Sequence, residues 1–289
     1  MTTVKIGVIG GSGLYEMEGL ANVREVVETT PYGAPSDALI CGDLGGVPMV
    51  FIPRHGRGHV LTPSEINYRA NIHALKTQGV THVISVSACG SLREEIEPGR
   101  IVLIDQFFDR TKGRASTFFG DGVVAHVAFA DPVCRDLRAL LLEVGRGLDI
   151  PVHDGGTYVC MEGPAFSTRA ESLFYRQIGA DVIGMTNLTE AKLAREAELS
   201  YATLALATDY DCWREHDADV DIQDILRVMA QNVTNAKAII RAAVPRVTMR
   251  IGEACFDALR FAIITDRAKI SAKRRDELRV IAGRYLDQS

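Results

Sequence analysis

Short apolar runs alternate with segments of helical periodicity along almost the whole chain, and this alternation limits the fold more than any other feature. The predicted strands cover residues 5–9, 24–30, 47–52, 83–86, 101–104, 157–161, 182–184 and 201–207. The predicted helices include residues 64–77, 137–144, 191–197 and 221–243. Such alternation is typical of proteins in which helices cover a sheet. We therefore expect a single α/β domain with a central mixed β-sheet flanked by helices.

Polar or glycine-rich clusters directly follow four of the predicted strands. They are Gly10–Gly13, Arg54-His55, Ser87-Ala88 and Asp209–Asp211. Ligands of α/β sheets bind beyond the carboxyl ends of the strands, where such loops converge. The sequence therefore predicts a ligand site at these clusters.

The first cluster favours a single phosphate over a dinucleotide. The dinucleotide motif G-x-G-x-x-G, begun at Gly11, requires glycine where Glu16 stands, and no long helix follows. A glycine-rich turn does offer unhindered backbone N–H groups, and Ser12 adds a hydroxyl. The alternative is a tight turn that binds nothing.

The second and third clusters add donors for an anion. Arg54 carries a permanent, forked positive charge that suits oxyanions, and His55 can donate to the same anion. Ser87 and Ala88 begin a run of small residues with accessible backbone N–H groups. The chain has no lysine at Walker-type spacing, which argues against a nucleoside triphosphate. A solvated basic turn is the alternative for the Arg-His pair.

The fourth cluster places two carboxyl groups at the end of an apolar strand. Asp209 and Asp211 face the same way if the chain stays extended. An acid in a partly desolvated pocket has a raised pKa and can share a proton with a heteroaromatic nitrogen. This is the chemistry that a purine leaving group needs at N7. The alternative is that one or both acids cap the following turn.

The composition is that of an ordinary globular protein. The 289 residues are 47% hydrophobic and 24% charged, and the net charge of −5 predicts no nucleic-acid or membrane partner. The apolar run near the N-terminus is too short for a signal peptide or a membrane span, so we expect a cytoplasmic protein. The six cysteines form no CxxC pair and have no histidine at ligand spacing, so no metal site is expected.

Six ordered motifs give the chain a family resemblance. They are GVIGGSGLY, PRHGRGH with PSEINYRANIHALK, SACGSLREEIEPG with VLIDQFFDRT, MEGPAFSTRAES, GMTNLTEAKLAREA and ATDYDCWREH. From about Val4 to about Ala243, the chain resembles the 5'-methylthioadenosine phosphorylases of the trimeric purine nucleoside phosphorylase family. The resemblance implies phosphorolysis of 5'-methylthioadenosine to adenine and 5-methylthioribose 1-phosphate. Phosphate is then a co-substrate, and no cofactor or metal is required.

The resemblance also implies a role for individual residues. The phosphate would be bound by Ser12, Arg54, His55, Ser87, Ala88 and Thr186. The nucleoside would be bound by Phe166, Ser167, Met185, Ile222, Ile225 and Leu226, together with the catalytic acids Asp209 and Asp211. His126 and Ile264 would reach the site of a neighbouring subunit in a homotrimer, which could pair into a dimer of trimers. For Ile264, packing on its own core is the alternative.

Three positions depart from the family pattern. Ser12 stands where threonine is common, Ala165 replaces an arginine, and Asn187 replaces a threonine. We expect Asn187 to border the base and ribose pocket, which leaves the choice between 6-amino and 6-oxo purines open. Asp209 favours a 6-amino purine, because a carboxylate accepts from an exocyclic amine and repels a second acceptor. Methylthioinosine or another purine nucleoside is the alternative substrate, and a nucleoside hydrolase or a nucleoside-binding protein is the alternative function.

The C-terminal part of the chain is expected to be helical. We place a phosphorylase domain over residues 1–250 and a C-terminal helical segment over 251–289. Within this segment, the spacing of Leu278, Ile281, Ala282 and Tyr285 predicts one amphipathic helix. We expect it to pack on the body or on a neighbouring subunit.

Overall fold

The computed structural model describes residues 3–214 and 222–286, without the side chains of Ser12 and of residues 222–226. The described strands are β1 (Ile6–Gly10), β2 (Leu20–Val26), β3 (Leu39–Leu44), β4 (Val47–Pro53), β5 (His82–Ser91), β6 (Ile101–Leu103), β7 (Gln106–Arg110), β8 (Val152–Asp154), β9 (Thr157–Met161), β10 (Val182–Gly184) and β11 (Ser200–Asp209). The described α-helices are α1 (Tyr68–Thr77), α2 (Arg135–Gly147), α3 (Arg169–Gln177), α4 (Asn187–Glu196), α5 (Ile222–Ala243), α6 (Ala272–Glu277) and α7 (Arg279–Leu286).

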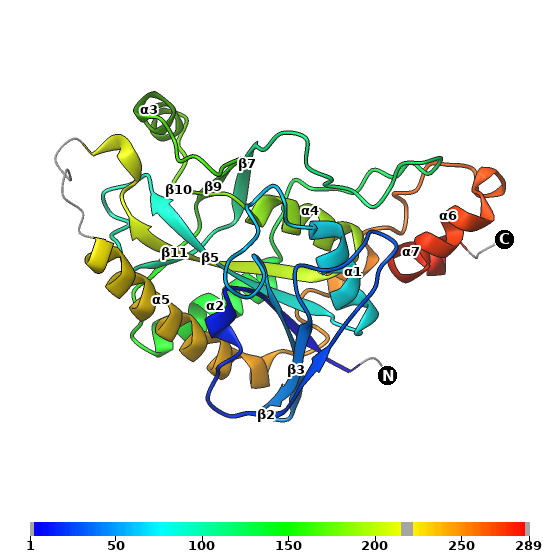
Figure 1. The fold of residues 1–289 in the computed structure, drawn as a ribbon, viewed down its shortest axis with the longest axis horizontal. Coiled ribbons are helices and arrows are strands. Elements are labelled where there is room, and N and C mark those ends of the chain that lie inside the picture. The colour runs from blue at the N-terminus through cyan, green and yellow to red at the C-terminus, as the bar shows by residue number, and fades with distance from the viewer. Residues whose placement is uncertain (1–2, 215–221, 287–289) are drawn as a thin grey trace.

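These strands form one mixed sheet, as predicted (Figure 1). β1 is parallel to its neighbours β4 and β5, and β11 is parallel to β5. β2, β3 and β4 form an antiparallel meander at one end, and β10 is antiparallel to β5. β5 therefore lies at the centre of the sheet, with its carboxyl end between β10 and β11.

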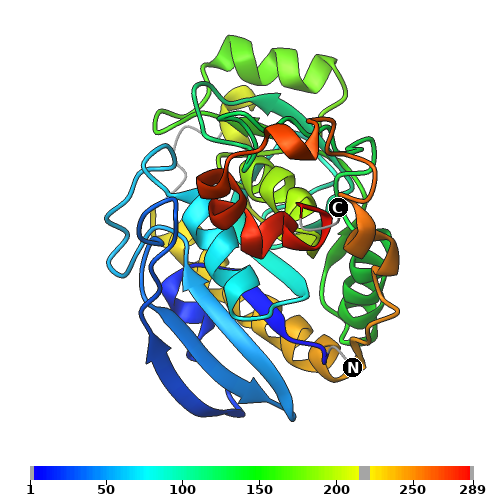
Figure 2. The same ribbon diagram turned by 90° about the vertical axis from the view of Figure 1, so that its right-hand side faces the viewer.

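Helices cover both faces of the sheet and pack over its two largest apolar cores. One core contains residues of α2 and α5, which pack on each other and on β11. The other contains residues of α1, α4 and α7. Figures 1 and 2 show these two sets of helices on opposite sides of the sheet. The prediction of a single α/β domain with a sheet flanked by helices is thereby confirmed.

Two predicted boundaries are wrong. The helix predicted from residue 64 begins at Tyr68, because the Asn67 side chain accepts from the backbone N–H of Ala70 and caps it there. The run Ser87–Ser91 continues strand β5 instead of forming a loop, since β11 and β10 pair with it on its two sides. After β1 the chain forms a single short 3₁₀ turn, Ser12–Leu14, which agrees with the rejection of a dinucleotide fold.

The C-terminal segment forms two short helices, α6 and α7, where one helix was predicted. Leu278 lies at the junction between them and is fully buried. Ile281, Ala282 and Leu286 of α7 are also buried in the core that α7 shares with α1. Figure 2 shows α6 and α7 lying against this side of the body.

Candidate active site

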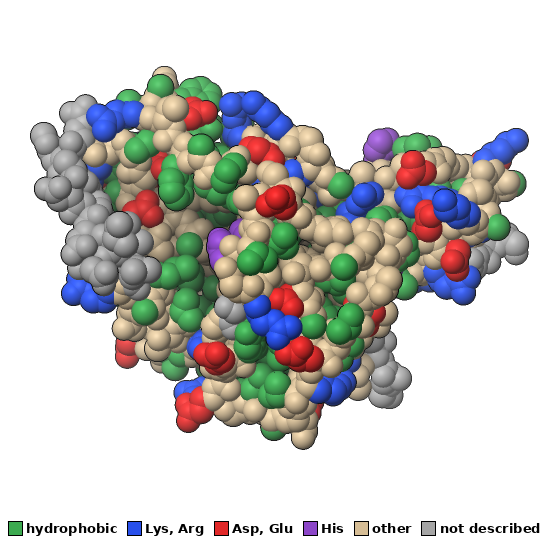
Figure 3. Space-filling model, viewed as in Figure 1, with side chains coloured by type: hydrophobic (Ala, Val, Ile, Leu, Met, Phe, Trp, Pro, Cys, Tyr) green, Lys and Arg blue, Asp and Glu red, His purple; other side chains and the backbone are tan. Residues whose placement is uncertain are grey.

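A cavity of about 640 Å³ lies at the carboxyl ends of β1, β4, β5 and β11. Figure 3 shows a hollow on one face of the molecule, with histidine side chains at its edge. The predicted site residues that line the cavity are Arg54, His55, Ser87, Ala88, Phe166, Met185, Thr186, Asp209 and Asp211. The side chains of Ser12, Ile222, Ile225 and Leu226 lie outside the described part of the structure.

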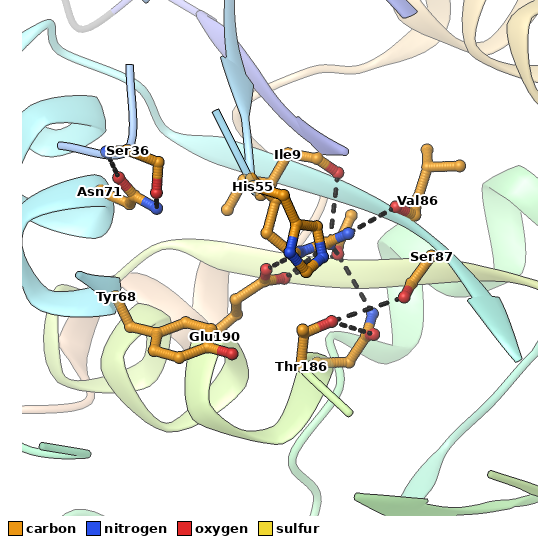
Figure 4. Close-up of polar contacts among 12 residues, drawn as sticks. Ile9, Ser36, His55, Tyr68, Asn71, Val86, Ser87, Thr186 and Glu190 are labelled. Carbon is orange, nitrogen blue, oxygen red and sulfur yellow. Dashed lines mark hydrogen bonds and ion pairs between the residues drawn. The ribbon is translucent and has the colours of Figure 1, made fainter. Parts of the chain in front are cut away.

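Arg54 is held beneath the cavity instead of extending freely into it. Its backbone N–H donates to Gly10, and its side chain is only 3% exposed. Nε donates to Glu190 Oε1 at 2.5 Å, and Nη1 donates to the carbonyl of Val86 at 2.9 Å. Burial lowers the pKa of Arg54, but the adjacent Glu190 carboxylate raises it more, so the guanidinium stays charged. Arg54 is therefore one half of a buried ion pair, whose acid, Glu190, is labelled in Figure 4.

His55 is oriented by the loop that follows it. Its Nδ1 donates to the Leu61 carbonyl at 2.8 Å, because a carbonyl can only accept. Its ring stacks on that of His59, with centroids 4.2 Å apart. Burial and the charge of Arg54 lower the pKa of His55, and the hydrogen bond to Leu61 opposes them. The loop therefore fixes the orientation of the His55 ring through Nδ1 and through the stacked ring of His59.

The hydroxyl groups of Ser87 and Thr186 face each other in the cavity that Arg54 and His55 also line. The Oγ of Ser87 lies 3.4 Å from the Oγ1 of Thr186, and both residues line the cavity. Thr186 precedes α4 and is almost fully buried. Both hydroxyls can turn to donate to one anion, Ser87 from the Ala88 carbonyl and Thr186 from Asn187 Oδ1, to which they donate here at 3.3 Å.

Asn187 does not border the cavity, contrary to expectation. It is fully buried, and its Nδ2 donates to Ser85 Oγ at 3.1 Å. Its Oδ1 accepts from the hydroxyls of Tyr158 and Thr186. Asn187 is the first residue of α4, and its buried amide supplies hydrogen-bond partners to the neighbouring hydroxyl groups. Of these groups, Thr186 lines the cavity, so Asn187 influences the cavity through Thr186.

The two acids lie against the carboxyl end of β5. Asp209 Oδ1 accepts the backbone N–H of Asp211, and Oδ2 accepts the Thr208 hydroxyl. Asp211 has a positive φ of 38° and accepts from Ser172 Oγ at 2.5 Å. Burial raises the pKa of Asp211, the Ser172 hydrogen bond lowers it, and the nearby charge of Asp209 raises it again. The chain thus turns after Asp209, and only part of the predicted extended geometry is present.

Strand β5 separates the two polar groups of the cavity. Arg54 donates to the carbonyl of Val86 on β5. Gly90, four residues further along β5, lies against Asp209, because a Cβ added at Gly90 would be only 3.1 Å from the Asp209 carboxylate. Four residues of extended chain span roughly 13 Å. One cavity therefore holds anion donors toward one end and paired carboxyl groups toward the other.

The wall of the cavity also contains apolar side chains that are not among the predicted site residues. They include Leu14, Val86, Met161, Ile183, Leu206, Met229 and Val233. Met229 and Val233 lie on α5, at helical spacing from the predicted Ile222, Ile225 and Leu226. The helical spacing of apolar residues in the sequence indicates that Met229 and Val233 share this face of the helix, and they extend the predicted apolar wall by two turns.

Phe166 and Met185 close one side of the cavity in different ways. Phe166 is 83% exposed although it lines the cavity, whereas Met185 is half-buried. Arg114 fixes the backbone of Met185 by donating from Nη1 to its carbonyl at 2.5 Å. Ser167 lies behind this side and does not line the cavity; its carbonyl accepts from Cys212 Sγ.

His126 and Ile264 lie together on the surface, away from the cavity lining. Segments 124–126 and 262–264 form an antiparallel pair, with His126 N–H donating to Ala262 and Ile264 N–H donating to Val124. His126 is exposed, and Ile264 is 64% exposed. The neighbouring Ile263 faces the core instead, so Ile264 itself does not pack on its own core.

Among residues 3–214 and 222–286, no three His, Cys, Asp or Glu side chains come together as a metal site requires. In the same part of the chain, no helix is both long and apolar enough to cross a membrane.

A sheet with anion donors and paired acids at its strand ends defines the class of α/β enzymes that cleave or transfer small polar substrates. The model of the Phosphorylase superfamily matches residues 5–245, so the chain belongs to that family. It is 61% identical to the S-methyl-5'-thioadenosine phosphorylase of Geobacter sulfurreducens, over 97% of this chain and 99% of that protein. The protein of the same name from Thermosynechococcus vestitus is 55% identical, over 98% of this chain and all of that one.

Solved structures agree with these relatives. The crystal structure of a methylthioadenosine phosphorylase from an antarctic soil metagenomic library matches with a TM-score of 0.92 and 48% identity, over 97% of this chain and 99% of that one. The methylthioadenosine phosphorylase of Schistosoma mansoni in complex with adenine matches with a TM-score of 0.81 and 37% identity, over 89% and 98% of the two chains.

Proposed function

We propose that this protein cleaves 5'-methylthioadenosine with inorganic phosphate, giving adenine and 5-methylthioribose 1-phosphate. The observation that carries the proposal is the cavity itself, which joins anion donors at Arg54 to paired carboxyl groups at Asp209 and Asp211. The relatives from Geobacter sulfurreducens and Thermosynechococcus vestitus, which bear the name of this activity, support the same substrate.

The proposed roles follow the two ends of the cavity. The phosphate is bound by Ser12, Arg54, His55, Ser87, Ala88 and Thr186. The nucleoside is bound by Phe166, Ser167, Met185, Asp209, Asp211, Ile222, Ile225 and Leu226, and the apolar wall of α5 receives the methylthio group.

The reaction separates charge, and the cavity is arranged to stabilise it. A phosphate oxygen forms a bond to C1' as the bond from C1' to N9 breaks, and the bonding electrons pass to the purine. Asp209, when it carries a proton, gives it to N7 and accepts from the 6-amino group. Preorganised N–H and O–H donors hold the phosphate against the cationic sugar. The proposal requires no metal, cofactor or covalent nucleophile.

We further propose that the protein works in the cytoplasm as a homotrimer. His126 and Ile264 support this assembly, because both are exposed, adjacent and outside their own cavity. Ile264 and Phe261, three residues apart in the sequence, are 64% and 89% exposed, and large exposed apolar side chains are of the kind that a second subunit covers. Sedimentation at assay concentration tests the trimer, and a fully active monomer would contradict it.

The activity is tested by measuring adenine release from 5'-methylthioadenosine with and without inorganic phosphate. We expect release only with phosphate, together with formation of the sugar phosphate. Release without phosphate would show a hydrolase, and binding without release would show a binding protein. Methylthioinosine and adenosine, assayed in parallel, determine how strictly the enzyme selects the 6-amino and methylthio groups.

A further inference from the structure

Glu190 is the buried acid that pairs with Arg54. It stands on α4, one turn after Thr186, and is 2% exposed. Figure 4 shows its carboxylate next to His55, with Thr186 and Ser87 to one side. Among the described residues it does not line the cavity, so it acts through its neighbours.

Every contact of the Glu190 carboxylate comes from a buried group. Oε1 accepts from Arg54 Nε at 2.5 Å. Oε2 accepts from Arg54 Nη2 at 3.2 Å, from Ser85 Oγ at 2.7 Å and from the Tyr201 hydroxyl at 3.1 Å. The carboxylate is thus fully hydrogen-bonded and fixed in one orientation.

These contacts leave Arg54 little capacity for a ligand. A guanidinium has five N–H donors. Nε is used by Glu190, Nη2 by Ser85 and Glu190, and one hydrogen of Nη1 by the Val86 carbonyl. In the described part of the chain this leaves one Nη1 hydrogen for the cavity that Arg54 lines.

The ion pair also reduces the field that a bound phosphate meets. Arg54 and Glu190 together carry no net charge, and their groups touch in a region shielded from water. Interactions of charges are strong in such a region, so a phosphate dianion beside an unpaired Arg54 would be bound tightly. Both the substrate phosphate and the proposed sugar phosphate product must leave this site.

Stability alone gives no reason for this pair. A buried ion pair loses so much hydration that well-packed apolar residues are often as stable or more stable. The pair lies directly under the cavity, and Ser85 links it through Asn187 to Thr186. Its position is therefore that of a group which serves the site.

We propose that Glu190 is a positioning residue that lowers the affinity for phosphate: it presents a single N–H of Arg54 to the anion and offsets most of the arginine charge. The proposal rests on the phosphorylase activity proposed above. It concerns phosphate and the sugar phosphate, and it predicts no change in binding of the purine.

The test is Glu190→Gln, which keeps the shape of the side chain and removes its charge. We expect the KM for phosphate to fall about three- to tenfold, because the buried charge of Arg54 is then no longer offset by Glu190 and attracts the phosphate more strongly. The kcat should fall as well, because the sugar phosphate leaves more slowly, while the KM for the nucleoside stays within about twofold.

The matched control is Glu196→Gln, which removes a second buried carboxylate from the same helix. Glu196 binds Thr117 and the backbone N–H of Phe118, and has no contact with Arg54. We expect this variant to keep the wild-type KM for phosphate. A loss of general packing in α4 would change both variants alike.

The outcomes separate the two proposals. If the wild type shows no phosphate-dependent cleavage, the proposed function is wrong. If the wild type is active but Glu190→Gln leaves the KM for phosphate unchanged or raises it, only the role of Glu190 is wrong. The same holds if Glu196→Gln lowers this KM equally.

A double variant decides the case in which Glu190→Gln does not fold. Arg54→Gln combined with Glu190→Gln carries no unpaired buried charge, so we expect it to fold. Its KM for phosphate should rise at least about tenfold with little change in the KM for the nucleoside, since a charge-assisted donor is lost. Failure of the double variant to fold, or an equal rise in both KM values, would make Glu190 structural and overturn the proposal.

Discussion

The guanidinium of Arg54 donates to both carboxylate oxygens of Glu190, although the two residues are 136 positions apart in the sequence. Arg54 follows β4 and Glu190 lies on α4, so the contact joins the end of a strand to a helix that packs on β5 and β11. Both side chains are almost completely buried. This pair connects the stability of the fold to the chemistry of the cavity.

Arg54→Ala should destabilise the protein as well as inactivate it. The substitution leaves the Glu190 carboxylate buried without a counter-charge, which costs about 3–5 kcal/mol. Arg57→Ala is the control from the same loop, because Arg57 is 43% exposed and pairs with Glu25 and Asp37 at the surface. We expect it to cost at most about 1 kcal/mol in urea unfolding. Equal free energies of unfolding for the two variants would show that the buried pair contributes no more than the surface one.

Asp209→Asn should change the preference for the purine base. The new amide can donate to the oxygen of a 6-oxo purine and can no longer supply a proton to N7. We expect kcat/KM for 5'-methylthioadenosine to fall about 10²- to 10³-fold and the ratio of methylthioinosine to methylthioadenosine cleavage to rise. Parallel steady-state assays measure both. An equal loss on both substrates would limit Asp209 to N7 or to a structural role.

The stability of the protein should fall as the pH rises through neutrality, because of Glu196. Burial raises the pKa of Glu196 to about 7 from 4.5, against the hydrogen bonds from Phe118 and Thr117. Folding therefore favours the protonated carboxyl, so its contribution is complete below about pH 4.5 and is lost as the pH rises through about 7. We expect Glu196→Gln to remove a decrease of roughly 2–3 kcal/mol in the free energy of unfolding between pH 5 and pH 8.

Urea unfolding over this pH range measures the effect. Glu143→Gln, at an exposed acid that pairs with Arg246 on the surface, should keep the wild-type pH dependence. If Glu196→Gln also keeps it, the buried carboxyl does not titrate in this range.

The C-terminal helices should stabilise the body through a few apolar contacts. Leu278 is fully buried at the junction of α6 and α7, so Leu278→Ala should cost about 2–4 kcal/mol. Val280→Ala is the control two residues away, since Val280 is 36% exposed, and it should cost less than about 1 kcal/mol. Thermal unfolding compares the two. A melting temperature unchanged by Leu278→Ala would mean that the segment is not coupled to the body.

Much of the fold follows from local patterns in the sequence. The apolar runs of β1, β4, β9 and β11 and the helical spacing of α5 were placed within a few residues of their observed bounds. These patterns record which side of one element is apolar, and that property is local. Strands β3, β7 and β8 and helix α3 are not predicted from the sequence. Helix α3 has nine residues, of which Ser172 and Tyr175 are buried, while its apolar Leu173 and Phe174 are about half exposed.

Part of the candidate site also follows from the sequence, and the rest depends on the tertiary structure. The sequence by itself determined that anion donors and the acids Asp209 and Asp211 follow apolar strands, because residue type and strand order are enough to place them at one edge of a parallel sheet. Only the tertiary structure decided that Arg54 is paired with Glu190, that Asn187 lies beneath the cavity, and that Ile264 is exposed beside the segment of His126. Each of these depends on contacts between distant segments, and the energy of a charge or an amide depends on which partner that packing supplies and on how much water it excludes.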